Sequence, residues 1–336
     1  MRRRESAMSS PQTDPRYEEK LAEFEARIAR GEKIEPDDWM PDEYRRQLIR
    51  LIQQHANSEV IGALPEGTWI PYAPTFKRKK ALVAKVQDEV GHGLMLYRAA
   101  ETLGKPREEM IEEMLSGKSK WSLVFAYPAE TWADVAIIAW LIDGGAIVNQ
   151  TIMATGSYAP YCRALKRIIY EESFHLKHGF DMVVTLAEGT KRQRDMLQDA
   201  LNRWWEPIIM FFGPPDTLSK HTPVLKRWGV KPKTNDEQRQ IFLRKFVPQI
   251  LDLGLTIPDP NLRYDEENDR WLYTEPDWDK FFDIIRGNGP MSKERLAVRR
   301  LAHEEGRWVR EALEATGIAR QLREAAVAAP SSSVVA

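Results

Sequence analysis

Two segments of the chain share an unusual form, in which an acidic residue and a glutamate are followed, three residues after the glutamate, by a histidine. They read Asp88-Glu89-Val90-Gly91-His92 and Glu171-Glu172-Ser173-Phe174-His175. In an α-helix, residues three apart lie on the same face, one turn apart. Each segment can therefore direct a carboxylate and an imidazole at a single point in space.

Both pairs stand where an amphipathic helix would carry apolar residues. Glu89 and His92 interrupt one apolar stripe, and Glu172 and His175 interrupt the other. The flanking apolar residues are Leu82, Val86, Leu94 and Met95 in the first segment and Leu165, Ile168, Ile169, Leu176, Met182 and Val183 in the second. Burying an unpaired carboxylate costs several kcal/mol, so these groups need partners in the core.

Two further carboxylates, Glu59 and Asp143, interrupt apolar stripes in the same way, and each precedes a Glu-x-x-His segment by nearly the same interval. Two helical hairpins packed face to face would bring four carboxylates and two imidazoles together, the ligand set of di-iron and di-manganese bundles. Oxygen and imidazole ligands suit iron or manganese. The predicted ligands are Glu59, Glu89, His92, Asp143, Glu172 and His175. The alternative is that these groups are surface charges or paired core ions.

Helical periodicity dominates the chain, which predicts an all-α fold. The expected helices cover residues 41–63, 75–104, 107–115, 132–153, 160–188, 191–212, 235–253, 278–286 and 292–316. The first of them should stop before Pro65, and residues 214–235 should form a loop. The expected units are a disordered tail (1–17), a ferritin-like four-helix di-iron bundle (18–255), a helical extension with a short hairpin at 261–274 (256–322) and a flexible tail (323–336).

Composition narrows the chemistry. The single cysteine, Cys162, excludes an intramolecular disulfide framework, a Cys-rich zinc site and a four-Cys iron–sulfur cluster. No Gly-x-Gly-x-x-Gly segment is present, so a nicotinamide or flavin site of the dinucleotide-binding type is not indicated. An oxygen-activating centre in this chain would therefore receive its electrons from a separate reductase.

Charge and hydropathy bear on partners and location. The net charge of -1 argues against nucleic acid as a partner. The most apolar run, residues 135–148, is too short to span a bilayer and predicts a buried helix. No apolar run follows the basic residues at the start, so a secretory signal is not indicated and we expect a cytoplasmic location.

Longer motifs extend the metal-binding pattern. They include Asp38-Trp39-Met40-Pro41-Asp42, Leu64-Pro65-Glu66-Gly67, Ala84-Lys85-Val86-Gln87-Asp88-Glu89, Ala146-Ile147-Val148-Asn149-Gln150, Phe212-Gly213-Pro214 and Thr234-Asn235-Asp236-Glu237. On these motifs, residues 20–315 resemble the catalytic A subunits of ring-1,2-phenylacetyl-CoA epoxidases, a family of bacterial multicomponent di-iron monooxygenases.

The resemblance implies an activity and an assembly. O₂ and reducing equivalents from NADPH would convert the phenyl ring of phenylacetyl-CoA to its 1,2-epoxide at two iron ions. FAD and an iron–sulfur cluster would reside on a reductase subunit. The other expected partners are a ferritin-like structural subunit without metal ligands and a small accessory subunit.

The resemblance also implies site residues. The six predicted metal ligands become iron ligands, and cations are needed for the phosphates of CoA. The residues carried over as substrate contacts are Arg50, Gln54, Lys120, Trp121, Ser122, Leu123, Met210, Ser219 and Lys231. Asp88 and Glu171 are candidate acceptors for the N–H groups of the ligand histidines, or simply solvated helix charges.

Two alternatives remain open at the level of sequence. One is a non-catalytic assembly subunit with a vestigial site, and the other is a ferritin-like iron oxidase or storage protein. His178 is either a spare ligand or, by preference, a structural histidine, and His55 is expected to be a satisfied core histidine near Glu59.

Overall fold

The computed structural model describes residues 15–219, 221–317 and 320–324. Helices make up nearly all the regular structure in these ranges, so the predicted all-α class is confirmed. The predicted tails, residues 1–17 and 323–336, fall almost entirely outside the described residues. The predicted division of the chain into units stays a prediction.

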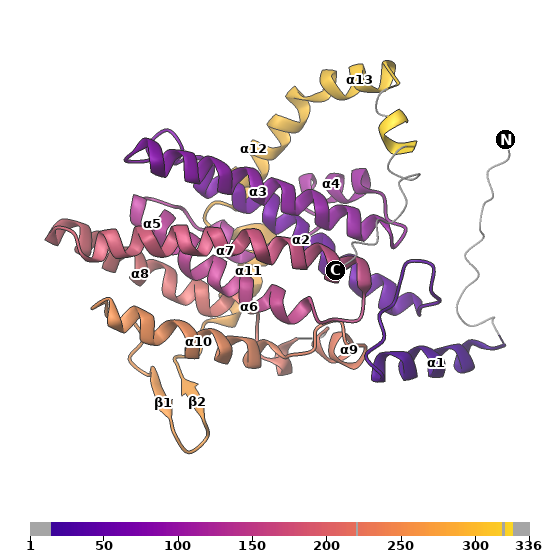
Figure 1. Ribbon diagram of the computed structural model, residues 1–336, viewed down its shortest axis with the longest axis horizontal. Coiled ribbons are helices and arrows are strands. Elements are labelled where there is room, and N and C mark those ends of the chain that lie inside the picture. Colours follow the sequence, from indigo (N-terminus) through magenta and orange to yellow (C-terminus); the bar gives the residue numbers. More distant parts are fainter. Residues whose placement is uncertain (1–14, 220, 318–319, 325–336) are drawn as a thin grey trace.

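Two helical hairpins form a four-helix bundle at the centre of the molecule (Figure 1). The first consists of α2 (Asp42–Gly67) and α3 (Phe76–Glu101). The second consists of a long composite helix, made of α5 (Trp132–Ile137), η3 (Ile138–Ile142) and α6 (Asp143–Met153), followed by α7 (Ala159–Ala187). Thr75 and Thr131 cap the N-termini of α3 and α5 by accepting hydrogen bonds from backbone N–H groups.

The composite helix spans residues 132–153, as predicted, but it contains a π-helical turn, η3, immediately before Asp143. Such turns insert an extra residue and change the direction of the side chains that follow. The helix has 22 residues and is the one helix in the described ranges that is long and apolar enough to cross a membrane. Because 72% of its most apolar window is buried inside the protein, the predicted assignment as a core helix is confirmed. The reason given from the sequence, that the apolar run is too short to span a bilayer, does not hold for the full helix.

Helix α2 continues beyond its predicted end at residue 63 and runs through Pro65 to Gly67. The backbone N–H of Thr68 donates to the carbonyl of Leu64, and that of Trp69 donates to the carbonyl of Glu66. Proline removes a single hydrogen-bond donor here and does not end the helix. As a result Glu66 lies on the helix and is buried in the bundle.

The predicted helices do not include the segments Tyr17–Ala29 and Thr222–Arg227. α1 (Tyr17–Ala29) packs Phe24 against Tyr44 and Trp228. α9 (Thr222–Arg227) interrupts the predicted loop at 214–235, which also holds the short turn η4 (Asp216–Leu218). The remaining early helix, α4 (Arg107–Leu115), has the predicted bounds.

The second half of the chain covers the bundle. α8 (Lys191–Phe211) and α10 (Asn235–Asp252) pack against the composite helix. The predicted hairpin is confirmed as strands β1 (Arg263–Asp265) and β2 (Arg270–Leu272), which pair antiparallel. α11 (Trp278–Asp283), η5 (Ile284–Asn288), α12 (Ser292–Glu305) and α13 (Arg307–Ala315) follow, with α12 and α13 separated at Gly306.

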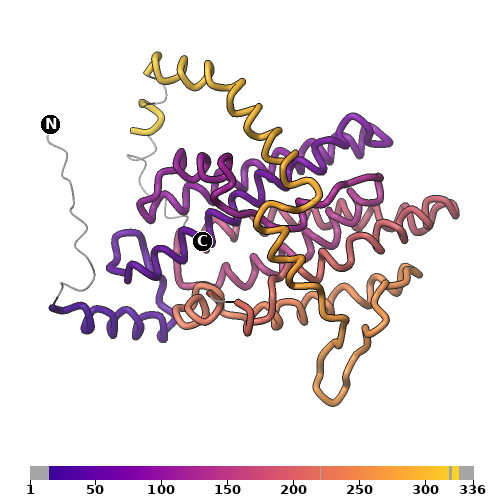
Figure 2. Tube along the Cα trace, turned by 180° about the vertical axis from the view of Figure 1, so that it is seen from behind, coloured from indigo at the N-terminus to yellow at the C-terminus, as the bar shows by residue number. Residues whose placement is uncertain are grey.

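The segment from α11 to α12 crosses the bundle on the side hidden in Figure 1, as Figure 2 shows in yellow-orange. It is attached to the bundle through arginines. Arg299 donates to the carbonyl of Val60 in α2, and Arg295 donates to the carbonyls of Phe125 and Tyr127. Phe125 belongs to the short turn η2 (Leu123–Ala126), so this segment supports both α2 and η2.

Candidate metal centre

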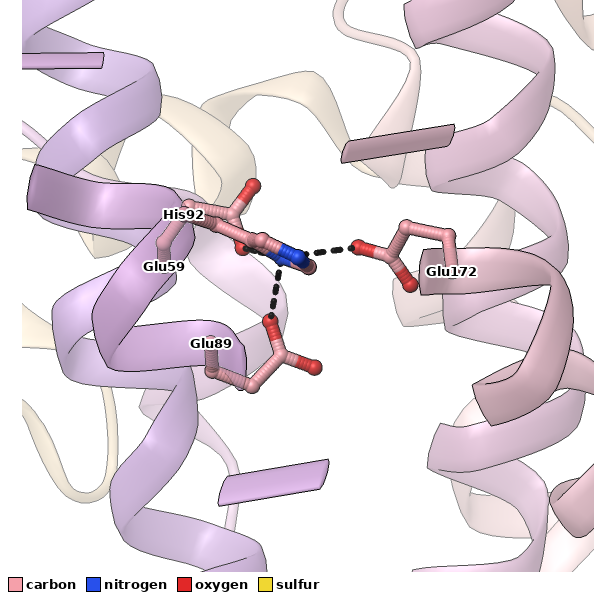
Figure 3. Close-up of side chains that lie close together, drawn as sticks. All are labelled: Glu59, Glu89, His92 and Glu172. Carbon is pink, nitrogen blue, oxygen red and sulfur yellow. Dashed lines mark ion pairs between the residues drawn. The ribbon is translucent and has the colours of Figure 1, made fainter. Parts of the chain in front are cut away.

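The six residues predicted as metal ligands meet at the centre of the bundle. They fall into two groups of four, Glu59, Glu89, His92 and Glu172 in one and Glu89, Asp143, Glu172 and His175 in the other. Within each group the potential ligand atoms lie within 4.8 Å of one another. Figure 3 shows the first group, with the imidazole of His92 surrounded by three carboxylates. Because Glu89 and Glu172 belong to both groups, they can be shared between two ions.

Each of the four bundle helices contributes to the cluster. Glu59 comes from α2, Asp143 from the first turn of α6, and the two Glu-x-x-His pairs from α3 and α7. All six residues are buried, and none of them exposes more than 8% of its surface. The i, i+3 spacing on α3 and α7 therefore does what the sequence indicated, because it directs both members of each pair into the core.

The histidine nitrogens face the carboxylates at distances that suit metal ligands. Nδ1 of His92 lies 3.7 Å from Glu89 Oε2 and from Glu172 Oε1, and it has no hydrogen-bond partner among the described residues. Nδ1 of His175 lies 3.1 Å from Glu172 Oε2 and 3.4 Å from Glu89 Oε1. Ligands about 2 Å from a shared ion are separated by roughly 3–4 Å. Both Nδ1 atoms fit this geometry.

The far side of each imidazole is held by the opposite helix. Nε2 of His92 on α3 lies 3.1 Å from Glu171 Oε2 on α7, and Nε2 of His175 on α7 lies 3.1 Å from Asp88 Oδ2 on α3. An Nε2–H group that donates to a carboxylate leaves the Nδ1 lone pair free for an ion. The pairing predicted for Asp88 and Glu171 is thus present, and it crosses from helix to helix.

Lys85 and Glu66 also belong to the site, although sequence reasoning did not assign them to it. Nζ of Lys85 lies 2.6 Å from Glu66 Oε2, 2.5 Å from Glu89 Oε1 and 3.1 Å from Asp143 Oδ2, and all of these groups are buried. The signal for Lys85 is its i, i+4 spacing from Glu89 on the inward face of α3. Glu66 falls outside the predicted helix, which ends before Pro65. The ammonium group ties α2, α3 and α6 together beside the cluster.

Negative charge outweighs positive charge at this centre. Among the described residues, Lys85 faces a group of five buried carboxylates, those of Glu59, Glu66, Glu89, Asp143 and Glu172. Burial, together with the charges of Glu89 and Glu172, raises the pKa of Glu59 well above its usual range. Burial raises the pKa of Asp143 likewise, although Lys85 opposes the shift. Carboxylates packed this closely cannot all ionise without further cations.

The raised pKa values of the two histidines also show that the site favours positive charge. Burial alone would lower the pKa of His175, but its contacts with Glu172 and Glu89 outweigh burial and raise the pKa to about 11. Burial also acts to lower the pKa of His92, and Glu89 and Glu172 reverse that effect and raise it. Metal ions bind deprotonated ligands and release such protons. The excess of carboxylates and the unpartnered Nδ1 of His92 therefore fit a pair of divalent cations.

A cavity of about 1170 Å³ extends from this cluster to the surface. Its inner end is lined by the buried carboxylates, and its outer end by exposed cations that include Lys118 and Arg286. The predicted substrate contacts that line it are Arg50, Gln54, Lys120, Trp121, Ser122, Leu123, Ser219 and Lys231. Met210 is fully buried in the core and is not among the lining residues.

Comparison with known proteins identifies the family. The model of the phenylacetic acid catabolic protein family matches residues 8–308. The chain belongs to this family. It is also 53% identical, over 289 residues, to the A subunit of the 1,2-phenylacetyl-CoA epoxidase of Escherichia coli (strain K12), and the match covers 86% of this chain and 94% of that protein. The family is ferritin-like and all-helical, so the predicted fold class is confirmed.

The two remaining histidines of the bundle have separate environments in this family member. Nε2 of His55 lies 2.9 Å from Glu59 Oε1, and its Nδ1 lies 2.8 Å from the hydroxyl of Tyr161. Burial lowers the pKa of His55 to about 4, which favours a neutral ring between Glu59 and Tyr161. His178 lies outside both metal-binding groups, beside Arg78, which favours the structural role preferred from the sequence.

Replacing Asp88 or Glu171 with alanine is expected to lower the affinity for metal by roughly 10–100-fold, because each substitution removes the acceptor that orients one histidine. Competitive titration with Fe(II) under anaerobic conditions measures this. Asp181→Ala is the matched control, since Asp181 is a carboxylate on α7 that pairs with Lys177 at the surface. Unchanged affinity in both Asp88→Ala and Glu171→Ala would show that the crossed contacts do not position the ligands.

Proposed function

We propose that this chain is the oxygenase subunit of a phenylacetyl-CoA epoxidase, which converts the aromatic ring of phenylacetyl-CoA to its 1,2-epoxide in aerobic phenylacetate catabolism. The observation that carries the proposal is the position of the cluster at the inner end of a large cavity with cations at its outer end. The 53% identity to the A subunit of the E. coli epoxidase supports the substrate and the reaction.

In this proposal the six residues of the cluster hold two iron ions. Glu59, Glu89, His92 and Glu172 would hold one ion, and Glu89, Asp143, Glu172 and His175 would hold the other. Bound iron would supply the site at which O₂ is activated. The protein holds the ligands in place through the crossed contacts of Asp88 and Glu171, and Lys85 offsets one of the negative charges.

The outer cavity suits the phosphates of CoA. Arg50 and Lys120 line it and make no ion pair with a carboxylate in the described ranges of the chain. Burial, together with the nearby charges of Arg50 and Arg286, lowers the pKa of Lys120, so both arginines repel the charged form of this lysine. Burial lowers the pKa of Lys231 to about 8, and a bound phosphate would keep this ammonium group charged. A polyanionic ligand relieves both effects.

The stoichiometry of the proposed reaction shows that the chain needs an external source of electrons. Phenylacetyl-CoA, O₂, NADPH and a proton give the ring epoxide, water and NADP⁺, so two electrons must enter for each turnover. NADPH, FAD and an iron–sulfur cluster are therefore placed on a separate reductase, in agreement with the single cysteine of this chain. A small accessory subunit completes the proposed complex together with a ferritin-like structural subunit, and we assign the complex to the cytoplasm.

Oxygen consumption by the reconstituted complex tests the proposal. With Fe(II)-loaded protein, the reductase and NADPH, we expect one O₂ to be consumed for each phenylacetyl-CoA, and no comparable uptake with phenylacetate plus free CoA. Iron-dependent O₂ uptake that ignores phenylacetyl-CoA and forms ferric mineral would favour an iron oxidase or store. A folded complex that binds no iron would favour the assembly subunit.

A further inference from the structure

The inner part of the cavity has a notch on α2, directly beside the metal cluster. Gly62 lies between Glu59 and Glu66, one turn from each, and all three residues line the cavity. Residues at i, i+3 and i+7 share one face of a helix. The face of α2 that carries two carboxylates of the centre therefore has no side chain at its midpoint.

The ring of Phe125 fills this notch. A β-carbon built on Gly62 would lie 2.7 Å from Phe125 Cζ and 2.9 Å from Cε1 and Cε2. Real side chains do not approach this closely, so the ring can reach α2 only because residue 62 is glycine. Phe125 is half-buried, because it packs against the hydrophobic core on one side and lines the cavity on the other.

The backbone around Phe125 is held by hydrogen bonds from the C-terminal segment. Its carbonyl accepts a hydrogen bond from Nε of Arg295 at 3.3 Å, and the carbonyl of Ala126 accepts one from the backbone N–H of Met291 at 2.8 Å. Both donors belong to the C-terminal segment that crosses the bundle. With its backbone held by this segment and its ring against Gly62, Phe125 has little freedom to move away from the cavity.

The segment that carries Phe125, residues 120–125, also reaches the outer cavity. Lys120, at the cationic end, precedes Phe125 by five residues, and five residues of extended chain span at most about 18 Å. One segment therefore connects the groups proposed to bind the phosphates with an aromatic wall beside the metal cluster. The cationic end of this segment suits the phosphates of CoA, and its aromatic end suits the aryl group of an aryl-CoA thioester.

We propose that Phe125, seated on Gly62, is the specificity-determining residue of the acyl end of the cavity and selects a phenyl-sized group for the metal centre. The inference rests on the proposed function, because it assigns a position to the ring of the substrate. The ring of Phe125 bounds the space next to Glu59 and Glu66, so its size and tilt decide which acyl groups fit.

Binding of acyl-CoA thioesters to the metal-free complex tests the inference independently of turnover. The probes are phenylacetyl-CoA, the larger 2-naphthylacetyl-CoA and the smaller acetyl-CoA. For Phe125→Ala we expect the preference for phenylacetyl-CoA over 2-naphthylacetyl-CoA to fall by about 10–200-fold, the range by which apolar pockets discriminate size. Acetyl-CoA should bind as it does to the unmodified protein, since the CoA contacts are untouched.

Gly62→Ala should have the opposite effect, because the new methyl group displaces the ring into the cavity. We expect phenylacetyl-CoA to bind at least about 10-fold more weakly while acetyl-CoA is unaffected. The double variant Gly62→Ala/Phe125→Leu should recover much of the loss, since the smaller side chain leaves room for the methyl group. Phe125→Leu alone provides a variant that keeps apolar packing if Phe125→Ala unfolds, with the same direction of change.

The control is Phe282→Ala, which removes another phenylalanine that lines the cavity, on α11. An equal change in selectivity for Phe282→Ala and Phe125→Ala would overturn the inference, as would unchanged selectivity in all Phe125 and Gly62 variants. In either case phenylacetyl-CoA would still bind to the unmodified complex. Failure of that complex to bind phenylacetyl-CoA would instead refute the proposed function.

Discussion

Alanine in place of Glu89 or Glu172 is expected to abolish the binding of both proposed iron ions. Each of these carboxylates belongs to both metal-binding groups, whereas Glu59 and Asp143 belong to one group each. Loss of a shared ligand weakens both sites and leaves the remaining carboxylates to bind protons instead. Iron content after anaerobic loading should fall from about two per chain to near zero.

This loss of metal affinity should exceed the loss caused by replacing Asp88 or Glu171, the carboxylates that contact Nε2 of the two histidines. Removing an acceptor such as Asp88 costs roughly 10–100-fold in affinity, and removing a shared ligand should cost more. Glu59→Ala and Asp143→Ala are the matched variants, and each should retain about one iron. Two irons in a folded Glu89→Ala/Glu172→Ala double variant would place the metal elsewhere in the molecule.

The arrangement of the bundle follows from the sequence because two independent signals agree. Helical periodicity locates α2, α3, the composite helix and α7. Charged residues within apolar stripes then mark the inward face of each helix, since an unpaired carboxylate is too costly to bury without partners. The position of Asp88 and Glu171, each just before a glutamate of the cluster, marks them as candidate acceptors for histidine N–H groups, but the sequence does not show that their contacts cross between α3 and α7.

Other features depend on tertiary structure that local patterns do not report. Pro65 predicts the end of a helix, but neighbouring hydrogen bonds carry α2 past it and bring Glu66 to Lys85. The π-helical turn before Asp143 has no local sequence signature, because its cost is offset by packing against α7. The cavity combines residues that are far apart in the chain, from Arg46 to Arg286.

The two helices of the second hairpin make a tight backbone contact beside the metal cluster. Gly179, one turn after His175 on α7, lies against the π-helical turn that leads to Asp143. A β-carbon on Gly179 would overlap the backbone carbon and oxygen of Ala139 and would lie 2.5 Å from the backbone nitrogen of Trp140. These are backbone atoms, so the overlap can be relieved only if the two helices separate.

Gly179→Ala is therefore expected to destabilise the protein by about 3 kcal/mol or more, at the upper end of the cost of overpacking. Chemical denaturation followed by circular dichroism measures this. Gly91→Ala is the matched control, since Gly91 lies within α3 between Glu89 and His92, and a β-carbon there would meet no neighbouring atom within 4 Å. It should stabilise the protein by up to about 1 kcal/mol, because alanine favours helix.

Gly179→Ala should also weaken metal binding even where the protein remains folded, because separating α7 from the π-helical turn moves His175 away from Asp143. Gly91→Ala should leave metal affinity unchanged despite its position between two ligands. Stability and iron content lost together in the first variant, and neither in the second, would show that this backbone contact sets the width of the centre. Equal stability of the two variants would mean that the bundle relaxes around residue 179 without cost.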